Sequence, residues 1–191
     1  MKKLNFIIKC GLALLLLSFY SCESWLNVTP SDRLSEEMLF NDREGFVKAL
    51  NGVYIELNTN ELYGRNLTAG ALDVMGQYYS VASSSHAFYN YGGLVYTGND
   101  EKALFDNMWQ KCYAVIACCN TIIEKCDENK AGLSPVWKGA IKGEALALRA
   151  MLHFDMLRLF GPLTSELDKE SIPYQTNSDQ TVTPLLSDDF R

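Results

Sequence analysis

The sequence predicts an all-α fold built from helix pairs joined by irregular loops. Two long stretches, Glu101–Lys125 and Pro135–Phe160, carry apolar residues at the three- and four-residue steps of a helix. The short polar connection Asp127–Ser134 between them favours an antiparallel hairpin. A third stretch, Asp42–Leu57, has the same helical spacing, so at least three helices can share a core.

The N-terminus has the pattern of a bacterial secretion signal. Three lysines precede or flank an apolar stretch, Cys10–Phe19, which is shorter than the about 20 residues that cross a bilayer. A small residue and then Cys22 follow, as at a lipoprotein cleavage site. We therefore expect residues 1–21 to be a lipoprotein signal peptide and Cys22 to carry the lipid. Several acyl chains on Cys22 would anchor the protein stably, because one chain alone binds a membrane only marginally. The alternative is plain cleavage that leaves an unmodified cysteine.

Composition narrows the range of partners. The 191 residues include 17 basic and 23 acidic side chains, for a formal net charge of −6, and removal of the signal lysines would make the chain more acidic. An acidic chain repels phosphate backbones, so we expect no nucleic-acid partner. It also repels anionic headgroups, which leaves the lipid to hold the protein at the membrane. The length suffices for one domain with a core.

The first half of the mature chain is less regular than the second. Residues 22–41 are polar and are expected to form a tether and lead-in. A helical domain is then expected over 42–191, with Asp42 capping its first helix. Glycines interrupt the segment Glu61–Tyr79, which favours a broken helix. The segment Ser80–Asn99 has no period and is expected to be a loop or short irregular strands.

The second half begins with the hairpin. Ser134 and Pro135 have the pattern of a helix N-cap followed by proline at the first helical position. Gly161, followed by Pro162, is expected to end the second helix as a C′ glycine. Near the C-terminus, Leu185–Asp189 resembles the start of another capped helix. We therefore expect the 191 residues to be the truncated, N-terminal part of a longer protein; the alternative is a polar tail.

Four of the six cysteines fall between Cys112 and Cys126. On one helix, Cys112, Cys119 and Cys126 are separated by about 10 Å per step, beyond the roughly 7 Å limit for a disulfide. A zinc site would need CxxC spacing or paired histidines, which are absent from this segment. We expect all four to be small packing residues; a disulfide to another element and a metal site are the alternatives.

Several segments in order resemble the SusD/RagB family. The stretch Gly143–Ala150, continued by His153–Leu157 and Leu159–Pro162, resembles the family signature GEAxxLRA…YF…LxxxFG. The other matching pieces are Trp25–Pro30 after the lipidated cysteine, Ala49 with Gly52 and Tyr54, Trp109 with Tyr113 and Asn120, and Ile172–Tyr174.

The resemblance implies a fold of tetratricopeptide-like helix pairs, although the chain shows no 34-residue repeat. It also implies a cell-surface, lipid-anchored outer-membrane protein that binds a glycan or another nutrient. Such a protein would deliver its ligand to a SusC-type TonB-dependent transporter. Family members are usually much longer than this chain.

A glycan binder needs aromatic faces for sugar rings and polar groups for hydroxyls. The segment from Tyr78 to Asp100 supplies both, and the resemblance places a ligand-facing loop in this part of the chain. The candidate ligand-binding residues are Tyr78, Tyr79, Tyr89, Tyr91, Tyr96 and Asn99. The alternative is ordinary packing of a tyrosine-rich loop.

Catalysis is not expected. The chain has two histidines, His86 and His153, and lacks a nucleophile elbow, an HExxH motif and a convergent acid pair. Glu144 and Arg149 are expected to be structural, and Asn120 to be a buried amide that bonds a neighbouring helix end. No catalytic residue, metal or cofactor is predicted. The three candidate classes are a nutrient-binding lipoprotein, a helical scaffold lipoprotein without a ligand, and a lipid-anchored hydrolase.

Overall fold

The computed structural model describes residues 36–162 and 171–179. The chain divides into two compact units, Met1–Met38 and Leu39–Arg191, and the second contains the predicted helical domain. The signal segment, Cys22, most of the tether and the predicted helix start at Leu185 lie outside the described residues.

Every regular element in the described part of the chain is a helix, which confirms the all-α prediction. The helices are α3 (Glu36–Leu39), α4 (Arg43–Leu57), α5 (Ala71–Met75), α6 (Tyr89–Gly92), α7 (Asn99–Glu128) and α8 (Pro135–Phe160).

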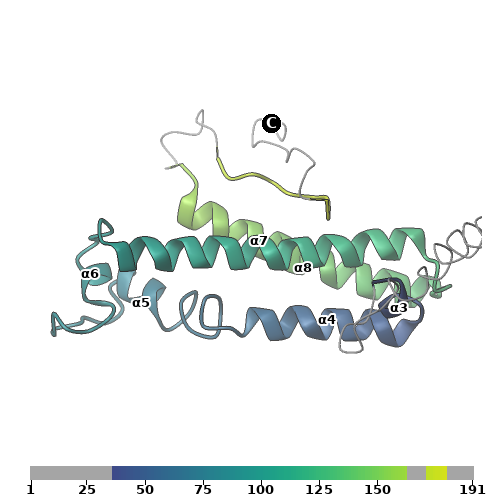
Figure 1. Cartoon of the computed structure of the whole chain (residues 1–191), viewed down its shortest axis with the longest axis horizontal. Helices are drawn as coiled ribbons and strands as arrows, with labels where there is room; N and C mark the ends of the chain where they lie inside the picture. The colour runs from purple at the N-terminus through teal and green to yellow at the C-terminus, as the bar shows by residue number, and fades with distance from the viewer. Residues whose placement is uncertain (1–35, 163–170, 180–191) are drawn as a thin grey trace, which may run out of the picture. The chain divides into compact units, whose positions relative to one another are not determined.

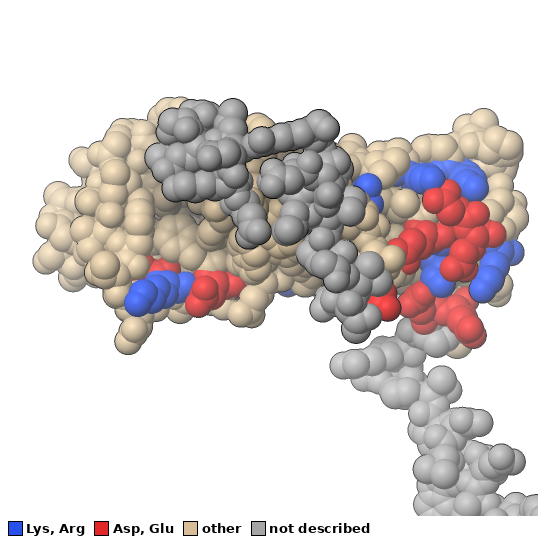
Figure 2. Space-filling model, turned by 90° about the horizontal axis from the view of Figure 1, so that it is seen from above, with Lys and Arg blue, Asp and Glu red and all other residues tan. Residues whose placement is uncertain are grey.

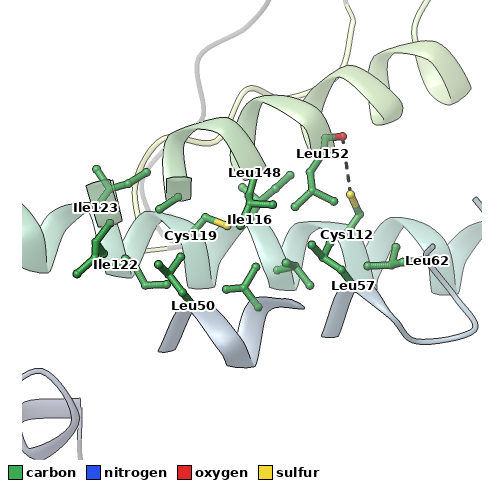
Figure 3. Packing of buried hydrophobic residues seen from close by; sticks show 14 of the residues in the cluster. Leu50, Leu57, Leu62, Cys112, Ile116, Cys119, Ile122, Ile123, Leu148 and Leu152 are labelled. Carbon is green, nitrogen blue, oxygen red and sulfur yellow. Dashed lines mark hydrogen bonds between the residues drawn. The ribbon is translucent and has the colours of Figure 1, made fainter. Parts of the chain in front are cut away.

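The two longest helices, α7 and α8, form the predicted antiparallel hairpin, and α4 packs against both (Figure 1). Val53 and Leu57 of α4, Ile116 of α7, and Leu148 and Leu152 of α8 all belong to one buried cluster. Figure 3 shows Leu57, Ile116, Leu148 and Leu152 of this cluster where the three helices meet. Each helix buries one apolar stripe in this shared cluster. The packed helices therefore hold the ends of the connecting loops in fixed positions.

Local capping fixes the helix ends. Asp42 Oδ1 accepts a hydrogen bond from Gly45 N at 2.8 Å, and Ser134 Oγ accepts one from Trp137 N at 3.5 Å, as the sequence predicted. Gly161 differs from its prediction because its backbone is extended (φ −74°, ψ 167°) rather than left-handed. The following Pro162 explains this, since proline disfavours helical backbone in the residue before it. Asn129, at φ 48°, supplies the left-handed cap at the end of α7 instead.

Three of the four hairpin cysteines are buried, and all four are free thiols. Cys112 lies against α8, where its thiol donates to Leu152 O at 3.8 Å (Figure 3). Burial raises the pKa of Cys112 and of Cys119 to about 12. The prediction that all four cysteines pack in the core is wrong for Cys118, which is exposed. It directly precedes Cys119, and neighbours in a helix point about 100° apart.

The segment between α4 and α7 is mostly irregular. Residues 58–70 form consecutive turns, and α5 is the remnant of the broken helix expected at Glu61–Tyr79. The loop expected at Ser80–Asn99 contains the short helix α6 that its sequence pattern did not predict. In Figure 1, α5 and α6 lie at the end of the hairpin where α7 begins, away from the α7–α8 turn.

Candidate ligand-binding site

A hollow of about 370 Å³ lies among the irregular segments beside α6. It is lined by Gln77, Tyr79, Ser80, Val81, Tyr89, Asn90, Gly92, Gly93 and Val95. Its volume falls at the lower end of the range for small-ligand pockets. Two aromatic rings, two valines and a few amide and hydroxyl groups are the mixture that a sugar requires, with apolar faces and hydroxyl edges.

The walls of this hollow are tied together by hydrogen bonds. Gln77, whose backbone is left-handed at φ 60°, donates from Nε2 to Gly92 O at 2.9 Å and to Val74 O at 3.3 Å. Tyr79 donates its hydroxyl to Ala69 O at 2.5 Å. These bonds join the segment after α5 to the end of α6 and hold the Tyr79 ring in place, so the hollow is preformed.

An ionised carboxylate, that of Glu101, is hydrogen-bonded to a residue that lines the hollow. Asn90 Nδ2 donates to Glu101 Oε1 at 2.7 Å, and this hydrogen bond is the largest cause that holds the pKa of Glu101 below its ordinary value. Glu101 lies in the first turn of α7 and turns back toward Gly98, the residue that caps this helix. A Cβ at Gly98 would meet Glu101 Oε2 at 2.0 Å, so a larger residue at this position would displace the carboxylate from its present place.

Of the six predicted ligand-binding residues, two line the hollow and four do not. Tyr79 and Tyr89 line the hollow and are 42% and 41% exposed. Tyr78 is 84% exposed and is not part of the lining. Asn99 is exposed at the start of α7, also outside the lining.

Tyr91 and Tyr96 belong instead to an aromatic cluster under the loop. Tyr91 is 2% exposed, and its ring contacts Phe88, Tyr96 and Phe105 at centroid distances of 5.8, 6.3 and 5.9 Å. Burial raises the pKa of Tyr91 to about 12. Tyr96 is half-buried on Phe105 at 5.4 Å. Both tyrosines therefore support the site from below. Gln77, Val81 and Val95 line the hollow without any sequence signal that marked them.

A second hollow, of about 420 Å³, lies at the other end of the hairpin between the start of α4 and the α7–α8 turn. Its aromatic residue, Trp137, is already covered by the Arg43 guanidinium, at 4.7 Å from the ring centroid. The two capping oxygens, of Asp42 and Ser134, are used by their helices. This hollow therefore offers a ligand fewer free groups than the one beside α6.

A polar strip on α7 and α8 holds the segment 171–179. Tyr113 donates to Pro173 O at 2.8 Å, and Asn120 Nδ2 donates to Gln175 O and Asn177 O at 3.2 and 3.1 Å. Asn120 Oδ1 accepts from Arg149 Nη1 at 2.8 Å. The Glu124 carboxylate accepts from the backbone and side chain of Ser178. Asn120 is thus a buried, satisfied amide, but it binds this extended segment and Arg149 rather than a helix end.

The other charged residues of the signature helix also have structural contacts. Glu144 accepts from the Tyr54 hydroxyl at 2.6 Å, and Asp155 accepts from Tyr63 at 2.5 Å and from Arg158 at 3.0 Å. Within the described residues no group of three or more His, Cys, Asp or Glu side chains could hold a metal ion. None of the described helices is long and apolar enough to span a membrane.

The helix pairs and the small aromatic-lined hollow define a helical protein with one hollow among the loops beside α6. A family model described as SusD-like, starch-binding and associating with the outer membrane, matches residues 24–187. The chain therefore belongs to the SusD-like family, as its motifs predicted.

Two curated relatives and one solved structure are also similar to this chain. SusD-like protein P2 of Formosa agariphila is 26% identical over 84% of this chain and 30% of the relative. SusD-like protein P25 of the same organism is 23% identical over 91% of this chain and 35% of the relative. The chain thus spans about a third of the length of these curated relatives. A crystal structure of a SusD superfamily protein from Bacteroides thetaiotaomicron superposes with a TM-score of 0.55 at 24% identity, covering 76% of this chain and 33% of that one, which supports the fold.

Proposed function

We propose that this protein is a non-catalytic, lipid-anchored protein of the outer membrane that binds a glycan through the hollow beside α6. The proposal combines the family, whose model is described as starch-binding and outer-membrane-associated, with the preformed hollow lined by Tyr79 and Tyr89. The two exposed rings are the observation that carries it, because a sugar can cover them while amide and hydroxyl groups bind its hydroxyls.

Substitution of the two rings tests the proposal. Tyr89→Ala and Tyr79→Ala should each weaken polysaccharide binding by roughly 2- to 10-fold, since each removes an apolar face worth about 0.5–1.5 kcal/mol. Binding would be measured with the purified chain, by mobility shift in native gels that contain soluble polysaccharides and by saturation-transfer NMR. Tyr78→Ala is the matched control, because Tyr78 is an exposed tyrosine outside the lining. If the wild-type chain binds no polysaccharide, or if all three variants behave alike, the proposed site is wrong.

The membrane anchor is proposed to be the lipid on Cys22, which ends the signal segment. Cys22→Ser should abolish incorporation of radiolabelled palmitate and either release the protein from the membrane fraction or leave it unprocessed with its signal attached. Cys10→Ser, inside the signal, is the control and should retain labelling. A correctly processed Cys22→Ser protein that stays in the membrane fraction would contradict the anchor.

The proposed partner is a SusC-type TonB-dependent transporter that receives the glycan. The support is the family membership together with the proposed outer-membrane location. Affinity purification of the tagged chain from the outer membrane of its own organism, after mild crosslinking, should recover a TonB-dependent transporter. Recovery of the chain without any such transporter would count against delivery, without affecting glycan binding.

A helical scaffold without a ligand is the second candidate. It is favoured by one observation: Leu146, Met151, Phe154 and Leu157 of α8 are exposed, with Arg158 beside the Phe154 ring as a neighbouring charge. A group of exposed apolar side chains marks a protein contact rather than a sugar site. A scaffold function predicts no change on Tyr89→Ala in any assay, so the same variants separate the two candidates.

A further inference from the structure

We infer that the hollow beside α6 selects uncharged glycans and rejects those that carry carboxylate or sulfate groups. This inference rests on the proposed function and names the substrate class of the same site. It follows from three features of the loop: its lack of charged residues, the acceptor character of its free amide groups, and the carboxylate hydrogen-bonded to one of its lining residues.

The first feature is the composition of the loop around the hollow. From Val74 to Gly98 the sequence contains no Asp, Glu, Lys or Arg. The acidic and basic side chains seen in Figure 2 gather mostly over the opposite end of the hairpin, where the end of α7 carries Asp127 and Glu128 and the start of α8 carries Lys138 and Lys142. The Arg65 guanidinium lies 5.8 Å from the centroid of the Phe88 ring and donates to Asn66, and neither Arg65 nor Phe88 lines the hollow. No lining residue could therefore form an ion pair with the carboxylate or sulfate group of an anionic sugar.

The second feature is the use of the amide donors. The two hydrogens on Gln77 Nε2 are directed at Val74 O and Gly92 O, and Asn90 Nδ2 donates to Glu101. What these two amides offer a ligand is chiefly the acceptor oxygens Gln77 Oε1 and Asn90 Oδ1. Sugar hydroxyls can donate to such oxygens, whereas a carboxylate or a sulfate ester needs donors.

The third feature is electrostatic. Glu101 is ionised at neutral pH, because its pKa is lowered, and it is bonded to a residue that lines the hollow. A fixed negative charge next to a site repels an anionic ligand and leaves an uncharged one unaffected. The acidic balance of the whole chain acts in the same direction over longer distances.

The test compares each neutral polysaccharide with a charged derivative of the same backbone. The purified chain is run in native gels that contain pullulan, dextran, galactomannan or arabinoxylan, and then the carboxymethylated or sulfated form of whichever polymer binds. At moderate salt, which limits long-range effects, the charged form should bind at least about tenfold more weakly. Glu101→Gln removes the charge but can still accept the Asn90 hydrogen bond, and it should narrow the gap between the neutral and the charged form of one polymer. Asp127→Asn changes the net charge equally at the far end of α7 and should leave the gap intact.

Each outcome is decisive. Equal or tighter binding of the charged derivatives would overturn the selectivity and leave the proposed glycan site standing. A preference for neutral polymers that Glu101→Gln does not reduce would overturn the part assigned to that carboxylate. Failure of every polymer, neutral and charged, would overturn the proposed function itself and this inference with it.

Discussion

His153 shows how a single buried side chain positions a distant segment. Its Nδ1 lies 2.9 Å from Arg149 O, so Nδ1 carries the proton, and its Nε2 accepts from Gln175 N at 3.1 Å. The ring also packs against Tyr174, with centroids 4.3 Å apart, and against Tyr113 at 6.1 Å. Both nitrogens are therefore satisfied only in the neutral tautomer, and this makes the segment 171–179 sensitive to protonation.

Acid should weaken the contact between His153 and the segment 171–179, because a protonated Nε2 cannot accept the hydrogen bond from Gln175 N. Burial is the largest cause that lowers the pKa of His153 below 6.5, the nearby Arg149 guanidinium acts in the same direction, and the hydrogen bond to Arg149 O opposes both. The unfolded chain therefore binds more protons than the folded chain just below the unfolded pKa of about 6.5. The stabilisation is complete above that pH and is lost as the pH falls toward the folded-state pKa.

His153→Gln is expected to remove this dependence, because an amide can replace both hydrogen bonds without titrating near neutrality. Urea unfolding between about pH 5.5 and pH 7.5 would measure it. His86→Gln is the control, since His86 is the chain's other histidine and is exposed. A wild-type stability that does not change over this range, or that falls as the pH rises, would contradict the assigned tautomer.

At the scale of the helices, glycines in similar sequence contexts have opposite roles. Gly45 lies in the first turn of α4 and is buried, and a Cβ there would meet Leu39 O at 1.5 Å. Gly139 and Gly143 lie inside α8, and a Cβ at either would meet nothing within 4 Å. Only the first of these positions needs the close backbone approach that glycine permits.

The expected stability changes therefore differ in sign. Gly139→Ala should raise the free energy of unfolding by about 1 kcal/mol, because alanine has the higher helix propensity and no clash opposes it. Gly45→Ala should lower it by about 1–3 kcal/mol, since backbone must move to admit the methyl group. Chemical denaturation of both variants under one set of conditions gives the comparison. A destabilised Gly139→Ala protein would show that another chain or segment packs closely on this face.

At the scale of the whole molecule, the outward face of α8 is unusual for a protein surface. Large apolar side chains are exposed along α8, with Val136 79% exposed near its start and Phe154 58% exposed near its end, where Arg158 lies 5.6 Å from the Phe154 ring centroid. Glu144, at its margin, is already bonded to Tyr54. Contiguous apolar surface of this kind leads to association in water.

We expect the purified chain to self-associate through this face. Phe154→Glu should shift the sedimentation behaviour toward monomer at concentrations where the wild type is larger, because a buried charge is costly at an apolar contact. Ala114→Glu, at an exposed position of α7, adds the same charge elsewhere and should have no effect. Monomeric wild-type protein over the whole concentration range would show that this face does not drive association by itself.

The sequence by itself determined the helices, because their signals are local. Asp42, Ser134 and Pro135 act within one helical turn, and the apolar periodicity of Glu101–Lys125 is repeated many times, so both can be read without knowing any distant contact. The family motifs are equally local strings, which is why the assignment to the SusD-like family could be made from them.

Tertiary structure alone decided which tyrosines line the hollow. Tyr89 and Tyr91 are two residues apart in an aperiodic loop, yet the first lines the hollow and the second is buried on Phe105. The same is true of Asn120, whose partners lie in the segment 171–179. Burial in a loop depends on contacts with residues far away in the sequence, whereas periodicity and capping report only neighbours. The helices were therefore predictable, and the lining of the hollow was not.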